Sequence, residues 1–61
     1  MTAVGKMQQR LERIERDLRF LRDQHYRVND HALRRDIECR ISQLQNEQAN
    51  LNEQLERNYA T

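Results

Sequence analysis

Hydrophobic residues recur along this chain at alternating steps of three and four residues, with polar and charged residues between them. An average spacing of about 3.5 residues places such side chains on one stripe of an α-helix, as in coiled coils. The first stripe contains Val4, Met7, Leu11, Ile14, Leu18, Leu21, His25, Val28 and Ala32. The second stripe contains Ile37, Ile41, Leu44, Gln48, Leu51 and Leu55. The pattern predicts two long helices, each with one stripe for packing against another helix.

The two stripes do not share one helical register. Continuing the first stripe beyond Ala32 would lead to Arg35, Cys39, Ser42 and Asn46, which make a poor hydrophobic surface. The phase therefore changes between Val28 and Ile37. We expect helices over about residues 3–27 and 31–58, joined by a turn over about 28–30, within a single domain of residues 1–61.

Residues with known capping preferences lie at these predicted boundaries. Thr2 and Asp30 are expected to cap the first and second helix by accepting backbone N–H bonds. Asn29 tolerates the left-handed conformation that often ends a helix. Neither Gly nor Pro occurs in the turn, so these polar residues carry the prediction.

The fold class that we predict is all-α, an antiparallel two-helix coiled-coil hairpin. The alternative is one continuous helix of about 90 Å in a parallel dimer, with the phase change as a stutter in the repeat. The hairpin is favoured because a continuous helix would place Arg34 or Arg35 at the helix–helix contact near the break.

The length of the chain predicts that the hairpin does not act alone. A chain of 61 residues forms a marginal core, and Cys39 has no second cysteine with which to form an internal disulfide. We therefore expect a homodimer in a four-helix bundle, or a complex with another protein. The expected oligomer seam comprises Leu11, Ile14, Leu18, Leu21, His25, Ile37, Ile41, Leu44, Gln48, Leu51 and Leu55.

Composition agrees with long helices that remain in water. Charged residues make up 34% of the chain, Pro is absent and Gly occurs once. No apolar run approaches the roughly 20 residues that a membrane span needs, and no apolar segment follows a basic start. These features predict a cytoplasmic protein that does not associate with membranes.

Few side chains suit catalysis or metal binding. His25 and His31 lie six residues apart, whereas a helical metal-binding pair is spaced by four, and Cys39 is the single cysteine. Acidic neighbours such as Glu12 and Glu15 are interpreted as a solvated helix surface. The sequence therefore predicts neither an enzyme nor a cofactor or metal site.

Four residues are predicted to bind a partner protein: Phe20, Tyr26, Leu33 and Arg16. Phe20 lies off the first stripe among charged residues, which is typical of an aromatic anchor with a polar rim. Tyr26 and Leu33 flank the turn. The leading hypothesis is a small protein-binding regulator or adaptor, such as an inhibitor, a chaperone or a scaffold, that acts through helix packing.

Five arginines suggest an alternative function as a nucleic-acid-binding regulator: Arg10, Arg13, Arg16, Arg19 and Arg22. Their steps of three residues form an oblique basic band, which is able to follow a phosphate backbone. The net charge is only +1, and acidic residues interleave with the arginines. Helical spacing also predicts the ion pairs Glu12–Arg16, Glu15–Arg19 and Asp23–Arg27. A third hypothesis is an oligomerisation segment of a longer protein.

Overall fold

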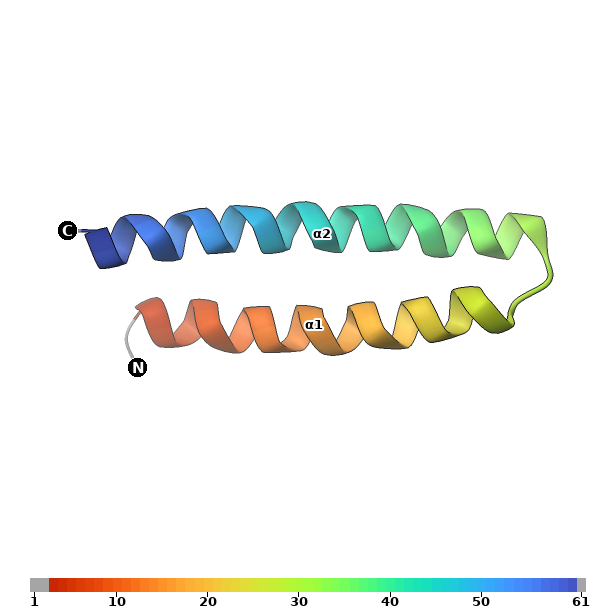
Figure 1. Cartoon of the computed structure of the whole chain (residues 1–61), viewed down its shortest axis with the longest axis horizontal. Helices are drawn as coiled ribbons and strands as arrows, with labels where there is room; N and C mark the ends of the chain where they lie inside the picture. Colours follow the sequence, from red (N-terminus) through yellow and green to blue (C-terminus); the bar gives the residue numbers. More distant parts are fainter. Residues whose placement is uncertain (1–2, 61) are drawn as a thin grey trace.

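The chain forms two helices that lie side by side and run in opposite directions (Figure 1). The structure, a computed structural model, describes residues 3–60. Helix α1 spans Ala3–Arg27, and α2 spans His31–Ala60, two residues beyond the expected end. The hairpin measures 47 × 17 × 12 Å along its principal axes. The predicted all-helical hairpin is therefore confirmed, and the continuous helix is not formed.

The reversal takes only three residues, and Asp30 organises it. The Asp30 Oδ1 accepts hydrogen bonds from the backbone N–H groups of Ala32 at 2.8 Å and Leu33 at 3.3 Å. The Asp30 carbonyl accepts the first helical hydrogen bond, from the N–H of Arg34 at 2.9 Å. Asp30 is thus the N-cap of α2, as its position in the sequence predicts.

The end of α1 differs from the expectation. No residue within 3–60 other than Gly has a positive φ, so Asn29 does not adopt the left-handed conformation. Instead, the Val28 N–H continues the helical pattern by donating to the Gln24 carbonyl at 2.9 Å. Three residues suffice to reverse the chain because Asp30 supplies partners for the N–H groups at the start of α2. The predicted cap at Thr2 lies outside the described residues.

The core lies along the middle of the contact between the helices. Its fully buried side chains are Ile14 and Leu44, and Leu18 is 4% exposed. Leu21, Ile41 and Leu51 pack against this cluster and stay partly exposed. Leu55 is also buried, nearer the end of α2. The phase change therefore has a simple geometric meaning, because a chain reversal lets both stripes face each other.

The stripes coincide with the inner sides of the helices almost throughout. The remaining predicted seam residues are half-buried: Leu11, Leu21, His25, Ile37, Ile41, Gln48 and Leu51. Ala32, which the spacing places at the end of the first stripe, is exposed. The reason is that the reversal has already begun, so Ala32 belongs to the first turn of α2.

We predict that either Leu18→Asp or Leu44→Asp unfolds the chain. Truncating a buried leucine costs about 2–5 kcal/mol, and an unpaired carboxylate in the same place adds a desolvation penalty. These losses are comparable with the whole stability of a small domain, about 5–15 kcal/mol. Far-ultraviolet circular dichroism would show the loss of helix. Asn46→Asp, at an exposed position of α2, serves as the control and should stay helical.

Candidate protein-binding surfaces

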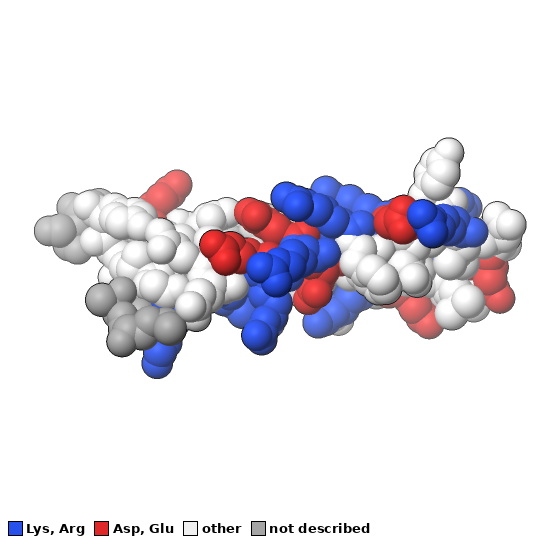
Figure 2. Space-filling view, turned by 90° about the horizontal axis from the view of Figure 1, so that it is seen from below, with Lys and Arg blue, Asp and Glu red and all other residues white. Residues whose placement is uncertain are grey.

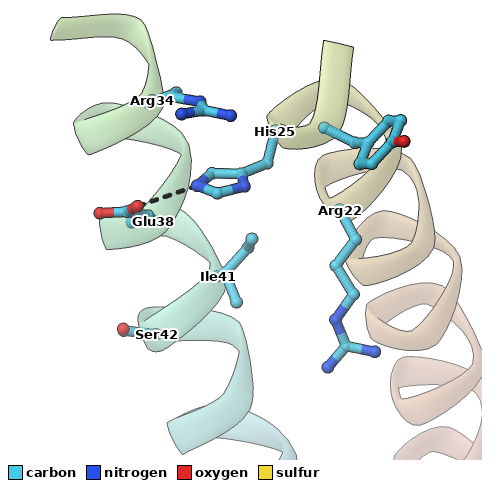
Figure 3. A pocket seen from close by; sticks show the side chains of 7 residues that line it. Arg22, His25, Arg34, Glu38, Ile41 and Ser42 are labelled. Atoms are coloured by element: carbon cyan, nitrogen blue, oxygen red, sulfur yellow. Dashed lines mark hydrogen bonds and ion pairs between the residues drawn. The ribbon is translucent and has the colours of Figure 1, made fainter. Parts of the chain in front are cut away.

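One broad face of the hairpin contains a groove close to the turn (Figure 3). Its lining residues come from both helices: Arg22, His25, Tyr26, Arg34, Glu38, Ile41 and Ser42. The His25 Nε2 lies 2.8 Å from the Glu38 Oε1 and joins α1 to α2 across the groove. His25 is thus a polar seam residue whose partner lies on the opposite helix.

Two guanidinium groups in the groove lack an acidic partner. Neither Arg22 nor Arg34 has an ion pair within 4.0 Å among residues 3–60. The Nε of Arg34 is buried and makes no hydrogen bond in that part of the chain. Figure 3 places Arg34 and the guanidinium of Arg22 at opposite ends of the groove, with the His25–Glu38 pair between them. The groove therefore combines positive charge with the apolar surface of Ile41.

The same broad face continues to the open end of the hairpin, where Gln8 Nε2 donates to Tyr59 OH at 3.0 Å. Gln8 and Tyr26 are 18 residues apart, which is five full turns at about 3.6 residues per turn. Ile41 and Tyr59 are separated by the same interval. The Gln8–Tyr59 pair and the groove therefore lie on one face, which we call the tyrosine face, about 27 Å apart.

The opposite broad face contains an ion pair between the helices. Arg10 Nε lies 2.7 Å from Glu47 Oε1, and both side chains are partly exposed. This hydrogen bond lowers the pKa of Glu47 and raises the pKa of Arg10. The negative charge of Asp17 acts on Arg10 in the same direction. The two halves of the chain are thus joined by opposite charges.

The five arginines of the predicted basic band do not share a face. Each step of three residues turns the side chain by about 60°, so the band winds through about 240° from Arg10 to Arg22. Arg10 lies beside Glu47 on one broad face, whereas Arg22 lines the groove on the other. Figure 2, which looks onto the outer side of α1, shows basic and acidic side chains interleaved. This arrangement favours no single contact with a straight phosphate backbone.

The predicted ion pairs within α1 are formed only in part. Asp23 and Arg27 lie within 3.4 Å of each other, as expected. Within residues 3–60, neither Arg16 nor Arg19 has an ion pair, so the predicted partners Glu12 and Glu15 are wrong. Exposed pairs of this kind contribute about 0–1 kcal/mol, and hydration competes with them.

The four predicted partner-binding residues do not form one surface. Phe20 is 62% exposed and lies about 200° around α1 from Leu18, on the side facing away from α2. Arg16 is one turn from Phe20 on the same side. Tyr26 is 86% exposed on the tyrosine face, whereas Leu33, 53% exposed, lies in the first turn of α2. The structure therefore brings only Phe20 and Arg16 together.

Other side chains that carry chemistry are dispersed in the described part of the chain. Cys39 is exposed, and no group of three or more His, Cys, Asp or Glu residues within 3–60 is close enough to hold a metal ion. Neither α1 nor α2, as described, is long and apolar enough to cross a membrane.

Comparisons with known proteins add no family to this description. The chain matches no protein-family model, and neither a curated protein nor a solved structure shows significant similarity to it. A function for this chain is therefore inferred from the geometry of the hairpin itself.

The tyrosine face was not predicted from the sequence, although the chain contains a signal for it. The residues one position after the core stripe of α1 repeat its spacing of four and three: Gln8, Glu12, Glu15, Arg19, Arg22 and Tyr26. We call this set the α1 edge stripe. Its polar composition is typical of an ordinary solvated surface, and only the Gln8–Tyr59 hydrogen bond and the groove that Arg22 and Tyr26 share with Arg34 mark it as part of a face.

We predict that Glu47→Gln destabilises the hairpin at neutral pH but not in acid. Because Arg10 lowers the pKa of Glu47 from 4.5 in the folded state, the carboxylate stabilises folding above pH 4.5. That stabilisation is lost as the pH falls through the lowered pKa. Thermal unfolding of both proteins across the acid range measures the difference. Glu56→Gln is the control, since Glu56 has no ion pair within residues 3–60.

Proposed function

We propose that this hairpin is a non-enzymatic protein-binding module, a small regulator or adaptor. In this proposal two hairpins associate into a four-helix bundle, and the outer side of α1 binds another protein through Phe20. The observation that carries the proposal is the amount of apolar surface left uncovered by the two helices. The large exposed hydrophobic side chains are Phe20, Tyr26, Leu33 and Tyr59.

Incomplete burial of the stripes supports association. The buried hydrophobic residues of the described chain are Ile14, Leu18, Leu44 and Leu55. Apart from the exposed Ala32, the other apolar stripe residues are half-buried: Val4, Met7, Leu11, Leu21, Val28, Ile37, Ile41 and Leu51. Covering their free sides with a second hairpin removes apolar surface from water, at about 25 cal/mol per Å². Small helical hairpins commonly complete their core in this way.

The environment of Phe20 supports a second contact on a different side. Its ring points away from α2, so it contributes nothing to the core of the hairpin. Arg16 lies one turn away and has no ion pair among residues 3–60. An exposed aromatic beside an unpaired arginine combines two residue types that are enriched at the energetic centres of protein interfaces.

We predict that the purified chain sediments as a dimer. Equilibrium sedimentation at micromolar concentration should give twice the 7.5 kDa mass of one chain. Dissociation on dilution should be accompanied by a lower thermal midpoint, because association stabilises the folded form. A monomer that stays fully helical and equally stable at every concentration would contradict the proposed bundle.

We predict that Phe20→Ala weakens partner capture at least tenfold, which corresponds to about 1.4 kcal/mol. Helicity and the sedimenting mass should not change, because Phe20 is exposed and lies outside the core. The partner is first identified by crosslinking to the wild-type chain, and its affinity is then measured with purified proteins. Asn46→Ala, at an exposed position of α2, is the matched control. Equal affinity of the Phe20→Ala variant for that partner would refute the assignment of Phe20.

A further inference from the structure

The groove near the turn has more positive charge than its own side chains neutralise. Arg22 and Arg34 line it, and Glu38 is the only acidic residue among the described residues that do so. Glu38 is already engaged, because its Oε1 lies 2.8 Å from the His25 Nε2. Neither guanidinium group has an ion pair within residues 3–60, so the groove attracts an anion.

Two further arginines add positive charge around the groove. Arg19 lies three residues before Arg22 on the α1 edge stripe, and Arg35 lies about two turns before Ser42 on α2. Ser42 lines the groove, so Arg35 is on the same side of α2. Neither arginine has an ion pair among the described residues. Both helices therefore contribute to a positive potential at the turn end of the tyrosine face.

The guanidinium of Arg34 has no acceptor of its own chain within residues 3–60. Its Nε is buried there and makes no hydrogen bond. A buried donor without an acceptor is unfavourable, so an incoming acceptor that pairs with it is bound more strongly. Arginine presents paired N–H donors that match the two oxygens of a carboxylate, whereas lysine does not. Arg34 is therefore well suited to bind a carboxylate.

The groove is apolar between its two arginines. Ile41 is half-buried there, and the Tyr26 side chain, 86% exposed, lies at the edge. Figure 3 shows Ile41 in the space between the two helices. The aliphatic part of the Arg22 side chain extends this apolar surface. A ligand that has an apolar side chain between two negative charges would cover all of these groups.

The separation of the two arginines sets the spacing of the charges that they bind. The two pairs between the helices, at 2.7 and 2.8 Å, place residue 22 level with about residue 38. Arg34 is therefore displaced from Arg22 by about four residues, or about 6 Å, along the hairpin. Packed helices lie about 8–10 Å apart, so the Cα atoms of the two arginines are separated by about 11 Å.

We propose that this groove binds an extended acidic segment of a partner protein, with two carboxylates on either side of an apolar side chain. In an extended segment, residues four apart lie on the same side, about 13 Å from each other, with one residue between them on that side. One carboxylate binds Arg34 and the other binds Arg22, while the middle side chain packs on Ile41. The volume of the groove, about 590 Å³, is within the range of about 300–1,000 Å³ that is typical of ligand sites.

This inference names a second contact of the protein-binding module proposed above and rests on that proposal. The groove lies on the tyrosine face, whereas Phe20 lies on the side of α1 that faces away from α2. A bundle of two hairpins covers one broad face of each copy and leaves the other free. The groove therefore stays open when the face with Arg10 and Glu47 forms the bundle.

Other ligands match only part of the groove. A nucleic-acid backbone supplies negative charge but no apolar side chain, so it leaves the apolar surface of Ile41 uncovered. An uncharged apolar segment would cover Ile41 and leave Arg22 and Arg34 without acceptors. Charges that lose hydration without gaining a partner oppose binding. Only a segment that is both acidic and apolar satisfies both parts.

A short synthetic peptide tests the groove directly. The probe is acetyl-Glu-Ser-Leu-Ser-Glu-amide, and its neutral counterpart has Gln at both Glu positions. Nuclear magnetic resonance titration of the isotope-labelled chain measures both dissociation constants, and the Nε–H signals of Arg22 and Arg34 locate the contact. We expect the neutral peptide to bind at least tenfold more weakly, and the acidic peptide to bind more weakly as salt is added. Equal affinity of the two peptides, or no saturable binding of the acidic one, would overturn the proposal.

Inorganic phosphate separates a peptide site from a general attraction for anions. At the same ionic strength, we expect phosphate to bind at least tenfold more weakly than the acidic peptide, because it makes no apolar contact with Ile41. Phosphate that binds as tightly as the peptide would make the groove a general anion site and overturn its assignment to an acidic segment.

Substitution of single arginines tests the two carboxylate contacts. Arg22→Gln and Arg34→Gln should each weaken binding of the acidic peptide at least fivefold, because each removes one partner. Arg22 is exposed, so its replacement should leave the hairpin folded, which circular dichroism checks. Arg13→Gln removes the same charge outside the groove and should stay within about twofold of wild type. A fivefold loss in this control, or wild-type affinity of both groove variants, would overturn the proposed contacts.

The outcome is distinguishable from a failure of the proposed function. Phe20→Ala should bind the acidic peptide as the wild-type chain does, because Phe20 lies outside the groove. A chain that captures its partner through Phe20 but does not bind the peptide would overturn the groove and leave the module standing. Dissociation of the dimer by the peptide would assign the groove to the second copy and overturn its assignment to a partner segment.

Discussion

Two helices cannot enclose a core, and this limit governs the rest of the molecule. Each helix covers only the inner side of its neighbour, so Ile14 and Leu44 at the middle of the contact are fully buried. Leu11 and Leu51 belong to the same stripes and remain half-exposed at the edges of the contact. A third surface is needed to remove their free sides from water. The proposed bundle is an answer to this geometric limit.

The features of the fold that could be predicted from the sequence are those that depend on local helix geometry. Ile14 and Leu44 identify the contact because a stripe with a period of 3.5 residues must face another helix. Asp30 identifies the turn because an N-cap needs a short side-chain acceptor directly before the helix. Both features depend on local geometry. The stagger between the helices does not, and it decides that Arg34 shares a groove with His25.

Two expectations failed for separate physical reasons, and two of the predicted partner-binding residues lie on different sides of α1. Asn29 keeps a negative φ because the Asp30 cap already satisfies the start of α2 over a three-residue turn. Glu15 and Arg19 do not pair within α1 because an exposed pair gains little over hydration. Phe20 and Tyr26 do not share a surface because six residues rotate a side chain by about 240° around the helix. For Asn29 and for Glu15 and Arg19, the surroundings in the folded chain outweighed a preference that holds between neighbours in sequence.

Charge and apolar area have different consequences in the proposed dimer. The half-buried hydrophobic residues would favour any second layer, since apolar burial has no direction. Charged side chains at the edges of the helices discriminate between layers, because only some orientations set opposite charges against each other. Electrostatic complementarity of this kind contributes specificity and orientation more than affinity. Removing these charges would therefore leave two copies that still associate but no longer prefer one orientation.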